Sequence, residues 1–300
     1  MSLQFDAFLG NADNFREPDR LVELAGMGSA VAGLFEPDSA AKGVLIFYHG
    51  GGANMRGYGG LADVVRRACR YAVLTPDIRG HGRSAGPRGF APTPETVWGD
   101  VDAAVAWASG AYPGVSLFVG GHSSGGGLAL NWATKRRPGA PPIAGLVLLA
   151  PLLSAQAESA NRRRTGAGFA KGRPWVFLAY LLSGRRLAAR SDAVRFTFPE
   201  EAAATGDLVR AYSPGMALAV TPSNAQAALS QLEVPVLMLA AGDDELFGAE
   251  HLPAASATAS YMTVEGTHLS CLANAAQPIA AFMLAEKTPS ARSANGRLGS

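Results

Sequence analysis

Short apolar runs alternate along the chain with segments in which apolar residues recur every three or four positions. The runs are rich in β-branched and aromatic residues, which is typical of strands buried on both faces of a parallel sheet. They predict strands at 44–48, 71–77, 117–119, 143–150, 234–241 and 260–264. Helical spacing predicts helices at 61–71, 97–109 and 275–286, another from Gly126, and 30–35 is expected to be an outer antiparallel strand. This order predicts an α/β fold of right-handed βαβ units, with helices on both faces of a mostly parallel sheet.

Residues 152–233 interrupt this alternation. They lie between two predicted sheet strands and contain no clear buried strand. Structureless loops of that length are rare in compact domains, so we predict a mostly helical inserted subdomain. The core then comprises residues 1–151 and 234–287, and the polar residues 288–300 are expected to form a disordered tail.

A serine lies between two glycines where a predicted strand gives way to a helix. The residues GHSSG at 121–125 match the nucleophile elbow, G-x-S-x-G. Such a turn holds Ser123 in a strained conformation and leaves no room for side chains at Gly121 or Gly125. The N-terminus of the following helix directs free N–H groups towards an oxyanion. The alternative is a glycine-rich turn whose serine has no chemical role.

A nucleophilic serine needs a general base, and the chain has five histidines. His49 lies in HGGG, an oxyanion-loop motif, and His81 lies in the loop RGHGRS. His122 precedes the nucleophile, where its side chain should point away, and His251 follows the acid candidates. His268, just past the last predicted strand, is therefore the predicted base, with a surface histidine as the alternative. The order Ser, Asp, His is the order that this architecture uses.

The orienting acid is expected at the carboxyl end of the strand at 234–241. Asp243, Asp244 and Glu245 are adjacent there, at the edge of an open α/β sheet where catalytic groups gather. Asp244 is preferred because one spacer residue separates it from two apolar residues that return to the core. Asp243 and Glu245 remain alternatives.

Composition narrows the classes of function. A net charge of +2 with 17% charged residues gives no overall field that would attract nucleic acid. The two cysteines, Cys69 and Cys271, lie far apart without metal-type spacing, which favours reduced thiols and a cytoplasmic protein. Residues 1–20 lack the pattern of a signal peptide, and no apolar run reaches the ~18 residues of a membrane span.

Five motifs, HGGG, DIRGHGRSAGPRG, GHSSG, GDDE and GTH, occur in this order over residues 20–286. Together they resemble the α/β-hydrolase superfamily and, within it, the bacterial lysophospholipase, monoacylglycerol lipase and serine aminopeptidase-like branch. The loop that begins at Asp77 is the part most specific to this branch. The resemblance implies an α/β-hydrolase fold with a variable lid at 152–233, and no cofactor or metal.

The resemblance also implies roles for individual residues. Ser123, Asp244 and His268 would form the triad, and Gly51 and Ser124 would supply the N–H groups of the oxyanion hole. The acid departs from the pattern, since Asp244 follows Gly242 after one residue where many relatives have two. The choice among the three neighbouring carboxylates therefore stays open.

The predicted lid combines basic residues with an apolar stretch at 174–182. Residues 152–195 hold two acidic residues, Glu158 and Asp192, and nine basic ones: Arg162, Arg163, Arg164, Lys171, Arg173, Arg185, Arg186, Arg190 and Arg195. An aromatic-rich helix in a basic region can contact an anionic membrane surface transiently or cover an acyl pocket. The predicted pocket residues are Trp175, Phe177, Leu178 and Leu181. Alternatively, the helix packs on the core and the arginines are solvated.

These observations predict a serine hydrolase that cleaves a carboxylic ester, an acylglycerol, a lysophospholipid or a similar small molecule, through an acyl-enzyme. One alternative is a serine aminopeptidase-type peptidase, in which Glu200 and Glu201 would hold the α-amine of the substrate. Another is a hydrolase-like binding protein without catalysis, which a complete triad argues against. Acyl length, leaving group and oligomeric state do not follow from the sequence.

Overall fold

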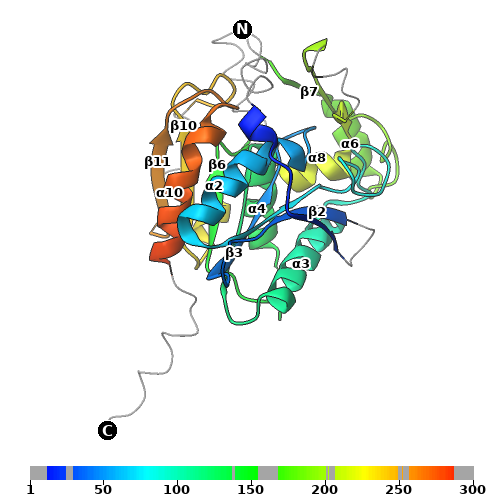
Figure 1. Ribbon diagram of the computed structural model, residues 1–300. Helices are drawn as coiled ribbons and strands as arrows, with labels where there is room; N and C mark the ends of the chain where they lie inside the picture. Colours follow the sequence, from blue (N-terminus) through cyan, green and yellow to red (C-terminus); the bar gives the residue numbers. More distant parts are fainter. Residues whose placement is uncertain are drawn as a thin grey trace.

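The computed structural model describes residues 12–24, 30–136, 139–154, 168–200, 202, 207–248, 252 and 257–286. Its centre is an eight-stranded sheet in the order β1-β2-β4-β3-β5-β6-β10-β11 (Figure 1). The strands are β1 (Arg20–Leu24), β2 (Ala30–Phe35), β3 (Gly43–Tyr48), β4 (Ala72–Pro76), β5 (Ser116–His122), β6 (Gly145–Leu149), β10 (Val236–Ala241) and β11 (Ala259–Val264). From β4 to β11 all neighbours are parallel, as predicted.

The two N-terminal strands are antiparallel to their neighbours. β2 pairs antiparallel with β4, as expected for 30–35, but β1 and not β2 is the outermost strand. The sequence analysis did not predict β1. It is five residues long and buries only Val22 and Leu24, so its apolar signal is weak.

Helices cover both faces of the sheet, as the alternation of the chain predicted. α2 (Gly59–Cys69) and α10 (Cys271–Ala285) pack side by side on one face, and α3 (Pro94–Ala111) and α4 (Ser124–Thr134) lie on the other (Figure 1). Successive side chains of a strand point to opposite faces of the sheet, so the core is divided into two parts. In β3, Val44 and Ile46 face α3 and α4, whereas Leu45 and Phe47 face α2 and α10. Burial on both faces explains why the strands read as continuous apolar runs.

Between β6 and β10 lies the predicted insertion, which contains strands as well as helices. Its described elements are β7 (Ala170–Gly172), α6 (Pro174–Leu182), β8 (Val194–Phe196), β9 (Ala211–Tyr212), α8 (Pro214–Val220) and α9 (Ala225–Ser230). β7, β8 and β9 form a separate antiparallel sheet, which the prediction of a mostly helical segment did not include. Strands of two or three residues are too short to carry a detectable alternation. α8 and α9 pack against α4.

The predicted site residues gather where the parallel strands end. β3 runs into His49–Gly52, β5 into Ser123, and β10 into residues 242–245. The carboxyl ends of parallel strands meet at one edge of a sheet, where α/β folds place their ligands. Two short 3₁₀ helices, η1 (Ala12–Phe15) and η2 (Met55–Tyr58), lie next to each other near this edge. In the described parts of the chain, no helix is both long and apolar enough to cross a membrane.

Candidate active site

Ser123 occupies a sharp turn between β5 and α4. Its backbone has φ 54° and ψ −118°, a conformation that a residue with a side chain rarely adopts. The turn is held by the N–H of Ser123, which donates to the carbonyl of Leu149 at 3.0 Å, and by the N–H of Leu152, which donates to the carbonyl of Ser123 at 2.9 Å. The flanking glycines are required by space: a Cβ on Gly121 would collide with the backbone of Gly125. The GHSSG motif therefore forms the strained turn that was predicted from it.

A histidine and a carboxylate meet beside this turn. The Nδ1 atom of His268 lies 3.0 Å from one carboxylate oxygen of Asp244 and 3.1 Å from the other. Both side chains are 3% exposed. A carboxylate only accepts hydrogen bonds, so Nδ1 of a neutral His268 carries the proton and Nε2 is left as the basic atom.

The three neighbouring carboxylates, of which Asp244 was preferred from the sequence, have different surroundings in the structure. Asp244 contacts His268 and also accepts the N–H groups of Leu246 and Phe247, each at 2.8 Å. Glu245 accepts the backbone N–H of His268 at 2.8 Å, whereas Asp243 is exposed. Two carboxylates thus fix the position of His268, one through its ring and one through its backbone.

The surroundings of Asp244 favour its charged form. Burial by itself would raise the pKa of this carboxyl group, but the charge and hydrogen bond of His268 and the N–H groups of Phe247 and Leu246 oppose it. The net effect is a lowered pKa, so Asp244 is a carboxylate near neutral pH. A charged Asp244 can stabilise a proton on His268.

The two predicted oxyanion-hole residues, Gly51 and Ser124, lie close together next to Ser123. Ser124 is the first residue of α4, and Gly51 lies in the loop after β3. A Cβ added to Gly51 would come within 2.9 Å of Oγ of Ser124, so the two residues are in close contact. Neither N–H donates to another described residue in the structure. Two amides at a helix N-terminus beside a serine are suited to bind an oxyanion.

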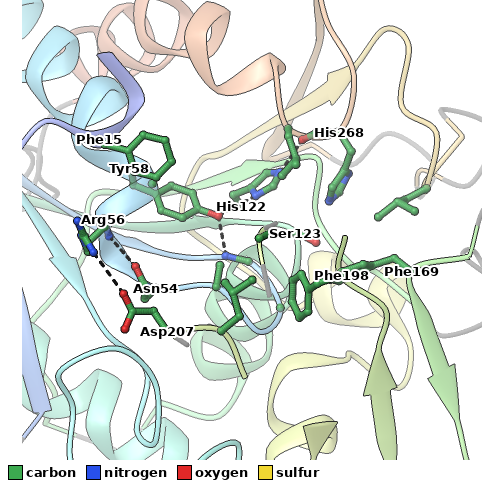
Figure 2. Close-up of a pocket in the computed structure, with 18 residues that line it drawn as sticks. Phe15, Asn54, Arg56, Tyr58, His122, Ser123, Phe169, Phe198, Asp207 and His268 are labelled. Atoms are coloured by element: carbon green, nitrogen blue, oxygen red, sulfur yellow. Dashed lines mark hydrogen bonds and ion pairs between the residues drawn. The ribbon is translucent and has the colours of Figure 1, made fainter. Parts of the chain in front are cut away.

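Ser123 and His268 line one cavity of about 210 Å³, enough for a small organic molecule and far more than the roughly 15 Å³ that one water needs. Figure 2 shows Phe169 and Phe198 on one side of Ser123, with Asn54, Arg56 and Asp207 on the other. Further apolar walls come from Phe15, Ala202, Leu208, Leu246 and Leu269. The cavity therefore has an apolar side at Phe169 and Phe198 and a mixed side, where the rings of Phe15 and Tyr58 accompany the polar side chains (Figure 2).

The four predicted pocket residues of α6 lie elsewhere. Trp175, Leu178 and Leu181 are 57%, 58% and 53% exposed, and Phe177 packs against the core on the α3 and α4 face. None of them is among the described residues that line the cavity. The helix buries Val176 and Tyr180 instead, and the Tyr180 hydroxyl donates to the carbonyl of Pro92 at 2.8 Å. The expectation that α6 borders the cavity was wrong, because an all-apolar stretch does not reveal which face it buries.

The other predicted residues are placed as follows. His49, His81 and His122 are buried and hydrogen-bonded, and His122 lines the cavity although it was expected to point away. Glu200 is exposed and is not among the lining residues. Several predicted residues fall outside the described part of the chain: Glu158, Arg162, Arg163, Arg164, Glu201, His251 and residues 288–300.

The sequence analysis missed most of the cavity wall. Phe15 comes from η1, Phe169 and Phe198 flank the small sheet, and Leu208 precedes β9. These residues are far apart along the chain, and no short motif contains them. The aromatic residues contact one another: the rings of Phe169 and Phe198 are 5.1 Å apart in an edge-to-face arrangement.

Comparisons with known proteins agree with this fold. Human monoglyceride lipase is 34% identical over 127 residues, which are 42% of this chain and only 41% of the human protein. The structure of a soluble variant of monoglyceride lipase from Saccharomyces cerevisiae is similar with a TM-score of 0.62 and 18% identity, covering 89% of this chain and 95% of that one. Est1E from Butyrivibrio proteoclasticus, with ferulic acid bound, has a TM-score of 0.60 and 18% identity, covering 89% and 99%.

A family model described as serine aminopeptidase, S33, matches residues 39–263. The match covers the elbow at Ser123, the carboxylates after β10 and the segment between β6 and β10. The two structures share the mostly parallel sheet and its flanking helices, which is the α/β-hydrolase fold. The resemblance seen in the sequence motifs is thereby confirmed, and the chain belongs to the serine aminopeptidase S33 family of α/β-hydrolases.

Proposed function

We propose that this chain is a serine hydrolase that cleaves carboxylic esters through an acyl-enzyme. The observation that carries the proposal is the buried Asp244–His268 pair, which opens on the same cavity as a serine in a strained turn. A nucleophile, a base and an acid that orients the base are the parts that acyl transfer needs. Ser123, His268 and Asp244 take these roles.

The reaction has two steps that use the same groups. His268 accepts the hydroxyl proton of Ser123 at Nε2 while the serine oxygen attacks the carbonyl carbon of the ester. The C–O bond to the alcohol then breaks, and His268 returns the proton to the leaving oxygen. Water repeats the sequence on the acyl-serine and releases the acid. The charge of Asp244 stabilises the imidazolium in both steps.

The N–H groups of Gly51 and Ser124 form the proposed oxyanion hole. The contact between Gly51 and Ser124 and the position of Ser124 at the N-terminus of α4 support this assignment. The negative charge exists only in the transition state and the tetrahedral intermediate, so these donors lower the barrier without tightening ester binding.

The cavity suggests how an ester lies in it. The acyl chain would lie against Phe169 and Phe198, and a polar alcohol group would face Asn54 and Arg56 (Figure 2). This arrangement suits an acylglycerol, a lysophospholipid or a similar small ester. Similarity to monoglyceride lipases supports the same class, although the matched part of the chain is short.

A peptidase is less well supported. Recognition of an α-amine requires a carboxylate in the cavity, and among the described lining residues the acidic side chain is Asp207. Its carboxylate already lies 3.2 Å from the guanidinium of Arg56. Glu200 is exposed away from the lining.

We further propose that residues 152–233 act as a lid. Phe169, Phe198, Ala202 and Leu208 from this segment line the cavity together with Ser123. Such a cover shields the acyl chain from bulk solvent and provides apolar surface for it at about 0.8 kcal/mol per CH₂ group.

The outer face of α6 is the proposed contact with a membrane surface. Trp175, Leu178 and Leu182 are exposed, with Lys171 and Arg186 nearby in sequence and exposed as well. Co-sedimentation with vesicles containing anionic lipid tests this. Leu182→Ser should weaken binding, whereas Leu284→Ser, at a half-exposed position on α10, should not. Equal binding by both variants would contradict the assignment.

A covalent probe tests the central proposal. A fluorophosphonate should modify the protein once, and Ser123→Ala should abolish modification, whereas Ser260→Ala on the outer strand β11 should not. Modification that persists in Ser123→Ala would refute the assignment. A series of nitrophenyl esters of increasing chain length, measured beside an aminoacyl anilide, then separates esterase from peptidase: higher kcat/KM on the anilide would favour the peptidase.

A further inference from the structure

Two tyrosine hydroxyls contact the loop that carries the proposed oxyanion donor. The N–H of Gly50 donates to Oη of Tyr58 at 2.7 Å, and the N–H of Gly52 donates to Oη of Tyr212 at 2.9 Å. Gly51 lies between these two residues in the chain and is in contact with Ser124. The N–H groups of Gly50 and Gly52 are therefore both held in hydrogen bonds, and Gly51, whose N–H the proposed reaction uses, lies between them.

Each tyrosine hydroxyl is in turn held by a buried histidine. Oη of Tyr58 lies 3.0 Å from Nδ1 of His122, whose Nε2 lies 2.8 Å from the carbonyl oxygen of His268. A carbonyl only accepts, so Nε2 of His122 carries the proton and Nδ1 accepts the hydroxyl proton of Tyr58. In Figure 2, Tyr58 and His122 lie next to each other between Phe15 and Ser123.

The second pair is arranged in the same way. Nδ1 of His81 lies 3.0 Å from the carbonyl oxygen of Arg79, and Nε2 of His81 lies 3.0 Å from Oη of Tyr212. His81 therefore donates to the carbonyl and accepts the hydroxyl proton of Tyr212. Each tyrosine oxygen then has its own proton directed at a histidine and its lone pair directed at a glycine N–H.

Burial supports these tautomers. The pKa of His122 is lowered to about 3 by burial and by the nearby charge of His268, and the pKa of His81 is lowered well below its ordinary value, mainly by burial. Both rings are neutral near pH 7, so each keeps the lone pair that accepts the tyrosine proton. A charged ring would donate at both nitrogens and would lose this bond.

We propose that Tyr58 with His122 and Tyr212 with His81 are two positioning pairs that fix the loop on both sides of Gly51 and direct its N–H at the oxyanion. The inference rests on the proposed function. Tyr212 belongs to β9 in the inserted segment, and the N–H of Val209 also donates to the carbonyl of Gly52 at 2.8 Å. The inserted segment thus helps to build the oxyanion hole as well as to cover the cavity.

The test removes one hydroxyl at a time. Tyr58→Phe and Tyr212→Phe should each lower kcat for a nitrophenyl ester about ten- to hundredfold, the range expected for a displacement of roughly 1 Å, with KM within about twofold of wild type. Tyr71→Phe is the matched control. Its buried hydroxyl also bonds the backbone, by donating to the carbonyl of Met283 at 3.0 Å, but Tyr71 precedes β4 at the opposite edge of the sheet. Its kcat should match that of the wild type.

A second readout separates positioning from general loosening. A boronic acid forms a tetrahedral adduct with the serine and places an oxygen in the oxyanion hole, so its Ki should rise in each variant by the same factor as kcat/KM falls. A variant pair at His81 extends the test. His81→Gln keeps an acceptor for Tyr212 and should remain closer to wild type than His81→Leu, which has none.

Three results are distinguishable. If folded Tyr58→Phe and Tyr212→Phe keep wild-type kcat and boronic acid affinity, the inference is wrong while the proposed function stands. The inference is also overturned if the variants raise KM without changing the affinity for boronic acid, or if His81→Gln and His81→Leu behave alike. A wild-type protein that neither hydrolyses esters nor binds the boronic acid refutes the proposed function, and the inference with it.

Discussion

Buried neutral histidines should make the stability of this protein sensitive to acid, and His122 gives the clearest case. Its pKa is about 3 in the folded protein and has an ordinary value of 6.5. The cause is burial, with a smaller contribution from the charge of His268. The hydrogen bond to the carbonyl of His268 and the charge of Asp244 act in the opposite direction. Because the folded-state pKa is the lower one, the unfolded chain binds the extra proton, and stability falls as pH falls from 6.5 towards 3.

The magnitude follows from the two pKa values. At pH 5 the unfolded chain is protonated at this position and the folded protein is not. This pH lies 1.5 units below the pKa of the unfolded state. At 1.36 kcal/mol per unit, His122 alone lowers the free energy of unfolding by about 2 kcal/mol between pH 7.5 and pH 5. His49 and His81, whose pKa values are also lowered, add to the loss. The lowered carboxyl pKa of Asp244 starts from an ordinary value of 3.8, below this window.

Urea unfolding at pH 7.5 and pH 5 measures the effect for the wild type and for His122→Asn. The variant loses hydrogen bonds and is less stable at pH 7.5, but it cannot titrate at this position. Its free energy of unfolding should therefore fall by about 2 kcal/mol less between the two pH values than that of the wild type. In this double difference, the pH-dependent contributions of the titratable groups that both proteins share cancel. Equal losses in both proteins would refute the reasoning, because they would show that His122 binds its proton equally in both states.

Three further predictions concern single substitutions, two of them paired with a control. Asp244→Asn should lower kcat by about four orders of magnitude, the effect of the same change in a serine protease triad, whereas Asp243→Asn at the exposed neighbour should leave kcat within a few fold. Phe198→Ser should lower kcat/KM for octanoate esters about tenfold and barely affect acetate esters, and Phe177→Ser should not discriminate between the two chain lengths. Tyr48→Phe should raise the free energy of unfolding by roughly 1 kcal/mol in urea titrations, because the buried hydroxyl of Tyr48 has no hydrogen-bond partner among the described residues.

The sheet and the turn at Ser123 could be predicted from the sequence because their signals are local. A parallel strand buried on both faces is a continuous apolar run, and a strained turn needs glycines at fixed positions. The same reasoning brought Asp244 and His268 to one edge of the sheet, where they lie in contact. It preferred Asp244 but kept Asp243 and Glu245 as alternatives, since the choice depends on side-chain directions at the end of β10.

The cavity wall could not be predicted, because it is assembled from segments that are distant in sequence. Phe15 and Phe198 meet in one cavity although most of the chain between them belongs to the core. In α6 the apolar residues lie on all sides of the helix, so no period distinguishes the face of Val176 and Tyr180 from the exposed face of Trp175. The tyrosine pairs were missed for a further reason: a buried hydroxyl leaves no pattern in the sequence.

The bonds of β9 restrict how substrate can reach the cavity. Val209 and Tyr212 are hydrogen-bonded to Gly52, and the N–H of Ser213 donates to the carbonyl of Gly89 at 3.0 Å. Any movement of β9 therefore breaks hydrogen bonds of the loop that carries the proposed oxyanion donor, and a lid that opened there would dismantle the site it covers. We therefore expect β9 to stay in place while substrate enters, so that it keeps the loop in position for the next substrate.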